Sequence, residues 1–103
     1  MGWVISARVV EVARALMTQP TVLLLDEPAS GQTEHETAAF GELLRRLVDE
    51  RGLAICLVEH DVGLVMGTCG LIHVLDYGEI IASGPPEQVK NDPTVVNAYL
   101  GAP

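Results

Sequence analysis

The stretch Thr21-Val-Leu-Leu-Leu-Asp-Glu-Pro28 decides the fold of this chain. Its first part is a short apolar run bounded by Pro20 and Asp26, which is typical of a strand covered on both faces in a parallel sheet. Asp26-Glu27-Pro28 then ends the strand in two adjacent carboxylates. Functional residues of open parallel sheets gather where the strands end, so the sequence directs attention to this rim.

A second apolar run, Leu53 to Val58, predicts another buried strand, and Glu59-His60-Asp61 follows its end. If the two strands are close neighbours, His60 and Glu27 lie on the same rim. Cys56, inside this run, is expected to be a small buried hydrophobic residue.

Helical patterns flank and separate these strands. Apolar residues recur at helical spacing from Ala7 to Met17, with Val9, Val10, Val12, Ala13, Leu16 and Met17 on the expected buried side. Thr33 and Glu36 stand in capping-box spacing and open a long helix that Arg51-Gly52 ends. Its expected buried stripe is Phe40, Leu43, Leu44, Leu47 and Val48.

The last third of the sequence predicts smaller elements. Asp61 can cap a short helix from Val62 to Met66. The runs 71–75 and 79–83 predict a β-hairpin around Asp76-Tyr77-Gly78. Pro86 and Asp92-Pro93 each favour the start of a short helix. The alternation of strands and helices indicates an α/β fold with right-handed crossovers.

Composition narrows the function classes. The chain has 103 residues, of which 49% are hydrophobic and 19% charged, so we expect a folded domain or part of one. Its net charge is −8, with no dense cluster of Lys or Arg, which argues against nucleic acid as a partner. No signal peptide and no apolar stretch of membrane-spanning length is visible, so we expect no direct insertion into a membrane.

The side chains of Asp26, Glu27 and His60, here called the rim residues, suit a site that binds a phosphate group or transfers it. The carboxylate of Asp26 suits a hydrated Mg²⁺, that of Glu27 could orient or deprotonate a water, and His60 could donate to a phosphate oxygen. The plainer alternative is a polar turn after a buried strand and a surface histidine beside a helix cap. Neither HExxH nor GxSxG occurs, so a zinc-protease or serine-hydrolase site is unsupported.

Taken in order, these segments resemble the ABC-transporter ATPase family from Arg8 to Gly101. Val22–Pro28 resembles the Walker B segment with its catalytic glutamate, and Ala29-Ser30-Gly31 the start of the D-loop. Val58-Glu-His-Asp61 is similar to the switch-histidine segment. The segments 59–67 and 91–101 are similar to the importer subunits for branched-chain amino acids.

The resemblance implies a fold and roles. It implies one partial ABC ATPase domain over residues 1–103, with a P-loop NTPase (RecA-like) core, parallel strands, a β-hairpin and short helices. It also implies ATP and Mg²⁺ as cofactors, with Asp26 holding Mg²⁺ through water, Glu27 polarising the attacking water and His60 at the γ-phosphate. Ser30 and Gly31 would contact the nucleotide. Transmembrane permease subunits and a second ATPase subunit or complementary N-terminal half would be partners, at the inner face of the cell membrane.

The sequence departs from the family at several motifs. No GxxxxGK[ST] occurs, and Gly2 to Ser6 does not read as the signature motif. Without the phosphate cradle, the carboxylates of Asp26 and Glu27 should repel ATP, so we expect the isolated chain to be inactive as an ATPase. Two alternatives stay open, namely a non-catalytic interaction module and a degenerate fragment that pairs with another ATPase half.

Overall fold

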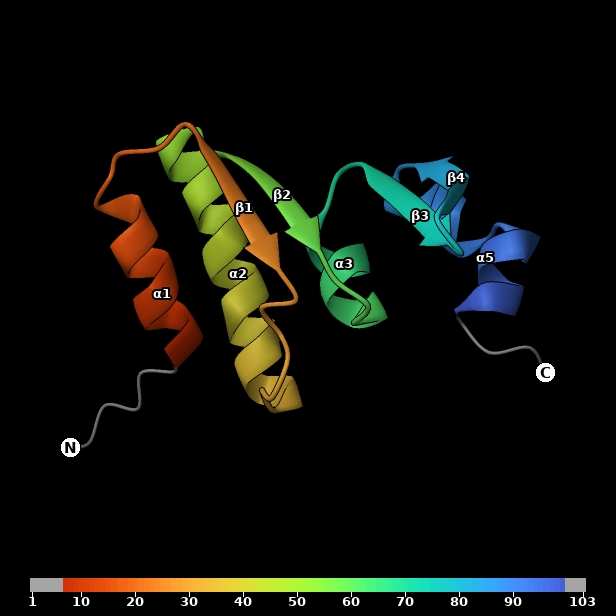
Figure 1. Ribbon diagram of the computed structural model, residues 1–103, viewed down its shortest axis with the longest axis horizontal. Coiled ribbons are helices and arrows are strands. Elements are labelled where there is room, and N and C mark those ends of the chain that lie inside the picture. Colours follow the sequence, from red (N-terminus) through yellow and green to blue (C-terminus); the bar gives the residue numbers. More distant parts are fainter. Residues whose placement is uncertain (1–6, 100–103) are drawn as a thin grey trace. The chain divides into compact units, whose positions relative to one another are not determined.

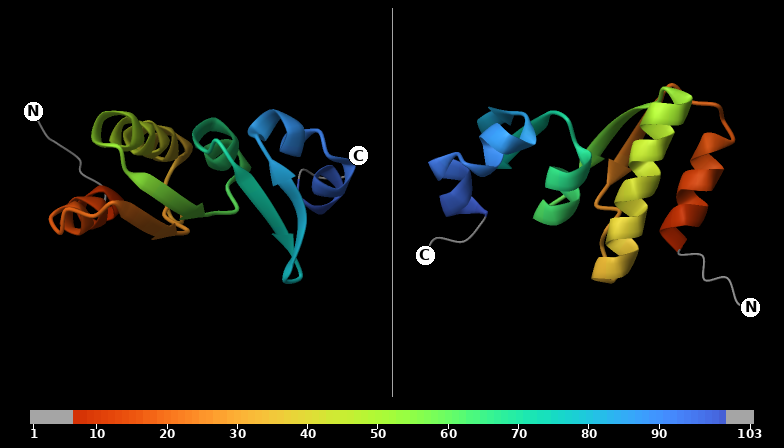
Figure 2. Two further views of the ribbon diagram at one scale, coloured as in Figure 1. Left: turned by 90° about the horizontal axis from the view of Figure 1, so that it is seen from above. Right: turned by 180° about the vertical axis from the view of Figure 1, so that it is seen from behind.

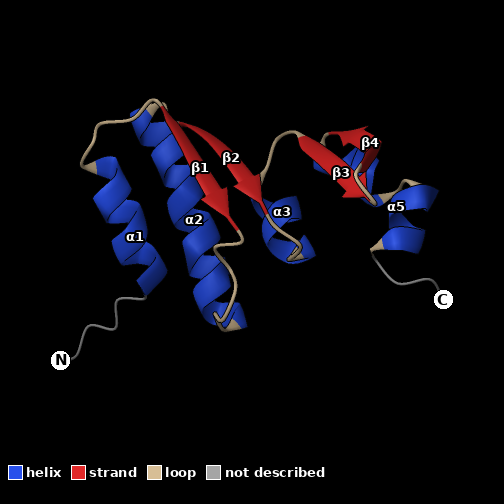
Figure 3. Ribbon diagram, viewed as in Figure 1, coloured by secondary structure: helices blue, strands red, loops and turns tan. Residues whose placement is uncertain are grey.

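The computed structural model describes residues 7–99, which divide after Glu59 into two compact units. The first unit runs α1 (Ala7–Leu16), β1 (Val22–Asp26), α2 (Glu34–Arg51) and β2 (Ala54–Val58), as Figure 1 and Figure 3 show. The strands β1 and β2 are parallel, with Val22 opposite Ala54 and Asp26 opposite Val58. The predicted α/β architecture with parallel strands joined through a helix is therefore confirmed.

The crossover helix α2 begins and ends where its capping residues predict. The Glu36 N–H donates to the Thr33 hydroxyl at 3.1 Å, and the Thr33 N–H donates to the Glu36 carboxylate at 3.3 Å. After Arg51 the chain enters the left-handed conformation at Gly52, with φ 66°, and the Gly52 N–H donates to the Val48 carbonyl. Both ends thus satisfy helix groups that would otherwise lack partners.

The core of this unit lies on the face of the two strands that α2 covers, and α1 lies beside β1 (Figure 2). Its buried residues come from both helices, from β1 and from the residue before β2, and they are Val12, Leu23, Phe40, Leu44, Leu47 and Leu53. Side chains alternate along a strand, so this packing covers one face of the sheet alone. On the other face, Val22 is 54% exposed, Leu24 74% and Val58 56%.

Four burial predictions are wrong for the same physical reason, and the first is that β1 and β2 are covered on both faces. Cys56 is exposed, because it pairs in register with Leu24 on the open face of the strands rather than with the helix-covered residues. Val10, Ala13 and Met17 of the predicted stripe on α1 are exposed, and so is Val48 on α2. An apolar pattern marks sides that can be buried, whereas burial requires a layer of protein against each of them.

The second unit contains α3 (Val62–Thr68), β3 (Ile72–Asp76), β4 (Glu79–Gly84), α4 (Pro86–Lys90) and α5 (Pro93–Ala98). The strands β3 and β4 form the predicted antiparallel hairpin, with Asp76 opposite Glu79. Tyr77 and Gly78 at its tip have φ of 50° and 80°, the left-handed pair that a two-residue hairpin loop of the primed type requires. Ile72, Val89 and Val95 form its buried core.

Short helices in this unit begin at the predicted caps. The Asp61 carboxylate accepts the Leu64 N–H at 3.1 Å, and the Asp92 carboxylate accepts the Thr94 N–H at 2.8 Å. Within the described range 7–99, no helix is long and apolar enough to cross a bilayer. The division into two units does not test whether residues 1–103 form one partial domain, so that stays a prediction.

Candidate functional site

The two predicted carboxylates lie where the parallel ladder ends. Asp26 is the exposed last residue of β1 and stands opposite Val58. The Glu27 N–H donates to the Val58 carbonyl at 2.7 Å, so the ladder extends one residue beyond β1. Glu27 itself has φ 47°, which is uncommon for a residue with a side chain and turns the chain sharply away from the strand.

The segment after Glu27 is a compact loop, here called the rim loop, residues 28–32. The Ser30 N–H donates to the Glu27 carbonyl at 3.2 Å, and the Gln32 N–H donates to the Ala29 carbonyl at 3.1 Å. Ser30 and Gly31 are exposed at its outer turn. Gly31 has φ 78°, and a Cβ there would meet no atom within 4 Å. Glycine is therefore favoured here by the left-handed backbone conformation and not by a lack of space.

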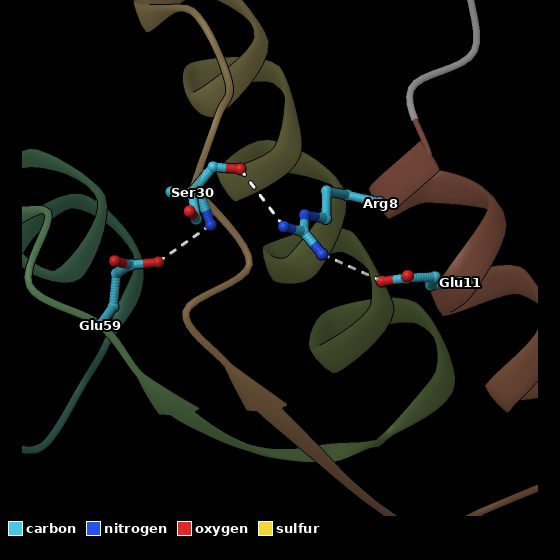
Figure 4. Close-up of polar contacts among 5 residues, drawn as sticks. Arg8, Glu11, Ser30 and Glu59 are labelled. Atoms are coloured by element: carbon cyan, nitrogen blue, oxygen red, sulfur yellow. Dashed lines mark hydrogen bonds and ion pairs between the residues drawn. The ribbon is translucent and has the colours of Figure 1, made fainter.

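Two side chains distant in the sequence reach this loop, as Figure 4 shows. The Glu59 carboxylate accepts the Ala29 N–H at 3.0 Å. The Arg8 guanidinium donates to the Ser30 carbonyl at 3.3 Å and pairs with the Glu11 carboxylate at 3.3 Å. Sequence reasoning placed neither residue in the site, because Arg8 reads as a solvent-facing helix residue and Glu59 as a neighbour of His60.

A small open hollow of about 220 Å³ lies beside this rim. It is lined by residues of α1, β1, the rim loop and α2, among them Arg8, Glu11, Asp26 and Phe40. Ligand pockets usually measure about 300–1,000 Å³ and enclose most of their ligand. The hollow is therefore too small and too open to hold a nucleotide by itself.

His60 is exposed and follows β2 by two positions, in the second compact unit. The next residue, Asp61, caps α3, so the backbone just beyond His60 is held at a helix start. Glu27 belongs to the first unit, and the sharing of one rim by His60 and Glu27 stays a prediction. The expected roles of Asp26, Glu27, Ser30, Gly31 and His60 are likewise untested by the geometry within each unit.

Donor chemistry at the rim suits Mg²⁺ in part. Among residues 7–99, no three His, Cys, Asp or Glu side chains gather into a metal-binding group. Mg²⁺ commonly takes one or two protein carboxylates and completes its shell with water and phosphate oxygens, and the exposed Asp26 carboxylate fits that arrangement. The Gly-rich P-loop with its lysine, which supplies amide and cationic donors to phosphates, does not occur in the sequence.

Known proteins are similar to this chain in sequence and in fold. The model of the branched-chain amino acid ATP-binding cassette transporter family matches residues 79–103. The high-affinity branched-chain amino acid transport ATP-binding protein LivG of Escherichia coli K12 is 46% identical over 94 residues, which are 91% of this chain. Over 91% of its length the chain is similar to ATP-binding proteins of ABC transporters. The resemblance inferred from the sequence is thereby confirmed.

Further relatives and solved structures agree. The BraF protein of Pseudomonas aeruginosa, of the same description, is 43% identical over 91% of the chain. The ATP-binding cassette MJ1267 in its ADP conformation superposes with a TM-score of 0.75 at 28% identity, over 95% of this chain and 41% of that one. The cbiO1 structure of Clostridium perfringens superposes with a TM-score of 0.78 at 29% identity, over 90% of this chain and 38% of that one.

The chain spans 37% of the length of the LivG and BraF proteins that it matches. The predicted position of a signature motif, Gly2 to Ser6, lies outside the described residues, as does the end of the tail segment at 100–101. The fold class, a partial ABC ATPase core with a hairpin and short helices, is confirmed by the structural neighbours.

Proposed function

We propose that this chain is the C-terminal part of the ATP-hydrolysing subunit of an ABC importer for branched-chain amino acids. The observation that carries the proposal is Asp26 and Glu27 at the shared end of two parallel strands, in a chain 46% identical to E. coli LivG. Phosphoryl transfer depends on positioning and on charge stabilisation, and carboxylates held at a rigid sheet rim suit both needs.

Each rim residue has a role in this proposal. Asp26 would hold Mg²⁺ through water, and Glu27 would accept a proton from, or orient, the water that attacks the γ-phosphate. His60 donates to a γ-phosphate oxygen, while Ser30 and Gly31 approach the nucleotide from the rim loop. Bound Mg²⁺ supplies neutralisation of phosphate charge, which six Lys and Arg side chains against 14 acidic ones cannot supply alone.

The open face of β1 and β2 supports a proposal about partners. Val22, Leu24 and Val58 form an exposed apolar surface, with Cys56 exposed beside them. Parallel sheets in proteins are normally covered on both faces. We therefore propose that a P-loop-bearing ATPase half covers this face, and that the assembled subunit pairs with a second ATPase subunit and with transmembrane permeases at the cytoplasmic side of the membrane.

A chimaera tests the proposed activity. In it, the 103-residue chain replaces the matching stretch of E. coli LivG, so that the rest of that protein supplies the phosphate cradle. We expect the chimaera to hydrolyse Mg-ATP and the isolated chain to release no phosphate above background. A folded chimaera that binds ATP without hydrolysing it would contradict the proposal, and steady turnover by the isolated chain would contradict its dependence on a partner.

The exposed apolar face also favours a second candidate, a non-catalytic module that binds another ATPase half. Thiol labelling of Cys56 separates the two, with Cys69 replaced by serine to remove the other thiol. Protection of Cys56 by the remaining part of LivG, together with restored hydrolysis, supports the enzyme. Equal protection without hydrolysis supports the module. A degenerate fragment would show neither protection nor a cooperative thermal transition.

A further inference from the structure

The rim loop follows a residue whose backbone conformation raises its energy. Glu27, which directly precedes the loop, has φ 47° although it carries a side chain. A backbone conformation of this kind persists only where surrounding contacts impose it. Something outside the loop must therefore hold this conformation.

Two charged side chains supply that restraint (Figure 4). Glu59, 30 residues from Ala29, accepts its N–H at 3.0 Å, and Arg8, 22 residues from Ser30, donates to its carbonyl at 3.3 Å. Hydrogen bonds to ionised groups are roughly twice as strong as neutral ones. The Glu59 contact is shorter and partly buried, whereas Arg8 is shared with Glu11 and more exposed. Glu59 is thus the stronger of the two restraints.

We infer that Glu59 is a positioning residue that fixes the rim loop, and with it Glu27, relative to the end of β2. The inference rests on the proposed function, since Glu27 and His60 have roles in that function alone. Glu59 directly precedes His60 in the chain, so its bond to Ala29 joins the backbone that leads into His60 to the loop that follows Glu27. A shift of either segment is transmitted to the other through this carboxylate.

Hydrogen exchange of the Ala29 amide in the 103-residue chain tests the restraint without any enzymatic activity. In Glu59→Ala the amide loses a charged acceptor, and we expect it to exchange about tenfold faster or more. Glu59→Gln keeps a side-chain carbonyl of the same length and should restore part of the protection. Glu50→Ala is the matched control, because Glu50 is an exposed residue whose ion pair with Arg46 lies at 3.6 Å. Unchanged exchange in Glu59→Ala overturns the inference.

Kinetics of the LivG chimaera test the consequence for catalysis. We expect Glu59→Ala to lower kcat for ATP hydrolysis about tenfold while KM for ATP stays within about twofold, because the loop orients Glu27 and does not cradle the phosphates. Glu59→Gln should recover part of kcat, and Glu50→Ala should leave both constants unchanged. A rise in KM at constant kcat, or no recovery in Glu59→Gln, would overturn the positioning role.

The two measurements separate failure of this inference from failure of the proposed function. An inactive chimaera with accelerated exchange in Glu59→Ala would refute the proposed enzyme while keeping the restraint on the loop. An active chimaera whose kcat ignores Glu59→Ala would refute the positioning role while keeping the enzyme. Since Glu59→Gln preserves size and one acceptor, it serves as the informative variant if Glu59→Ala fails to fold.

Discussion

The rim loop and the helix starts of the tail, which begins at β4, are held by side chains at different distances along the chain. In the tail, which the family model matches over residues 79–103, the start of α5 is capped by a neighbour in sequence, because the Asp92 carboxylate accepts the Thr94 N–H. The rim loop is held by contacts that span 22 and 30 residues. The family model thus matches a segment whose helix start is encoded locally, whereas the rim loop depends on long-range contacts.

This contrast explains which features the sequence predicted well. Caps and turns follow from a few adjacent residues, so the start of α2 at Thr33 and the hairpin tip at Tyr77-Gly78 were predicted correctly. The strand ends that place Asp26 were also predictable, because an apolar run that stops in carboxylates is a local pattern. The roles of Arg8 and Glu59 were not, since each depends on a loop far away in the chain.

The largest expected effect is on ATP hydrolysis, which should depend on the rim and not on the tail. In the LivG chimaera, Glu27→Gln should lower ATP hydrolysis by about a hundredfold or more, because general acid–base groups contribute roughly 10²- to 10⁴-fold. The matched change in the tail is Glu87→Gln, at an exposed residue of α4 paired with Lys90 at 3.2 Å, and it should leave turnover unchanged. Phosphate release with Mg-ATP measures both. Equal loss in the two variants would indicate a folding defect rather than chemistry.

Two leucine substitutions compare the buried core of the first unit with the open face of its sheet. Leu44 is 1% exposed inside the first unit, and Leu44→Ala should lower the unfolding free energy of the chain by ~2–5 kcal/mol. Leu24→Ala removes the same atoms from a residue that is 74% exposed, and it should change that free energy by less than ~0.5 kcal/mol. Urea unfolding followed by circular dichroism measures both. A large loss in Leu24→Ala would mean that the open face is already covered.

Packing also explains why the burial of Cys56 was mispredicted. The sequence of β2 carries apolar residues on both faces, which predicts a strand covered on both sides. Within residues 7–59 the helix α2 covers one face of it. Burial of the second face depends on whether another part of the protein or a partner packs against it. The pattern of apolar residues along the strand therefore does not predict it.

We expect the helix caps in the two regions to contribute equally to the unfolding free energy, because each cap depends on residues close to it in the sequence. Thr33→Ala removes the side-chain acceptor at the start of α2, and Asp92→Ala removes the one at the start of α5. Each should cost about 1 kcal/mol of unfolding free energy, measured by urea titration. Thr18→Ala is a control, because Thr18 follows α1 and its hydroxyl donates to the Ala15 carbonyl in the last turn of that helix, so it caps no helix start. A much larger loss in either variant would show that its cap supports more than its own helix.

A substitution on the open face should change the unfolding free energy least and should weaken binding of the partner. Leu24→Thr on the open face keeps a residue suited to strands and should alter the unfolding free energy of the isolated chain by less than ~0.5 kcal/mol. With the remaining part of LivG, however, the same change places a hydroxyl where an apolar layer is proposed to pack. Protection of the Cys56 thiol should then require several-fold more partner than in the unsubstituted chain. If Leu24→Thr leaves this protection unchanged, another surface of the chain binds the partner, and the bare face of β1 has a different cause.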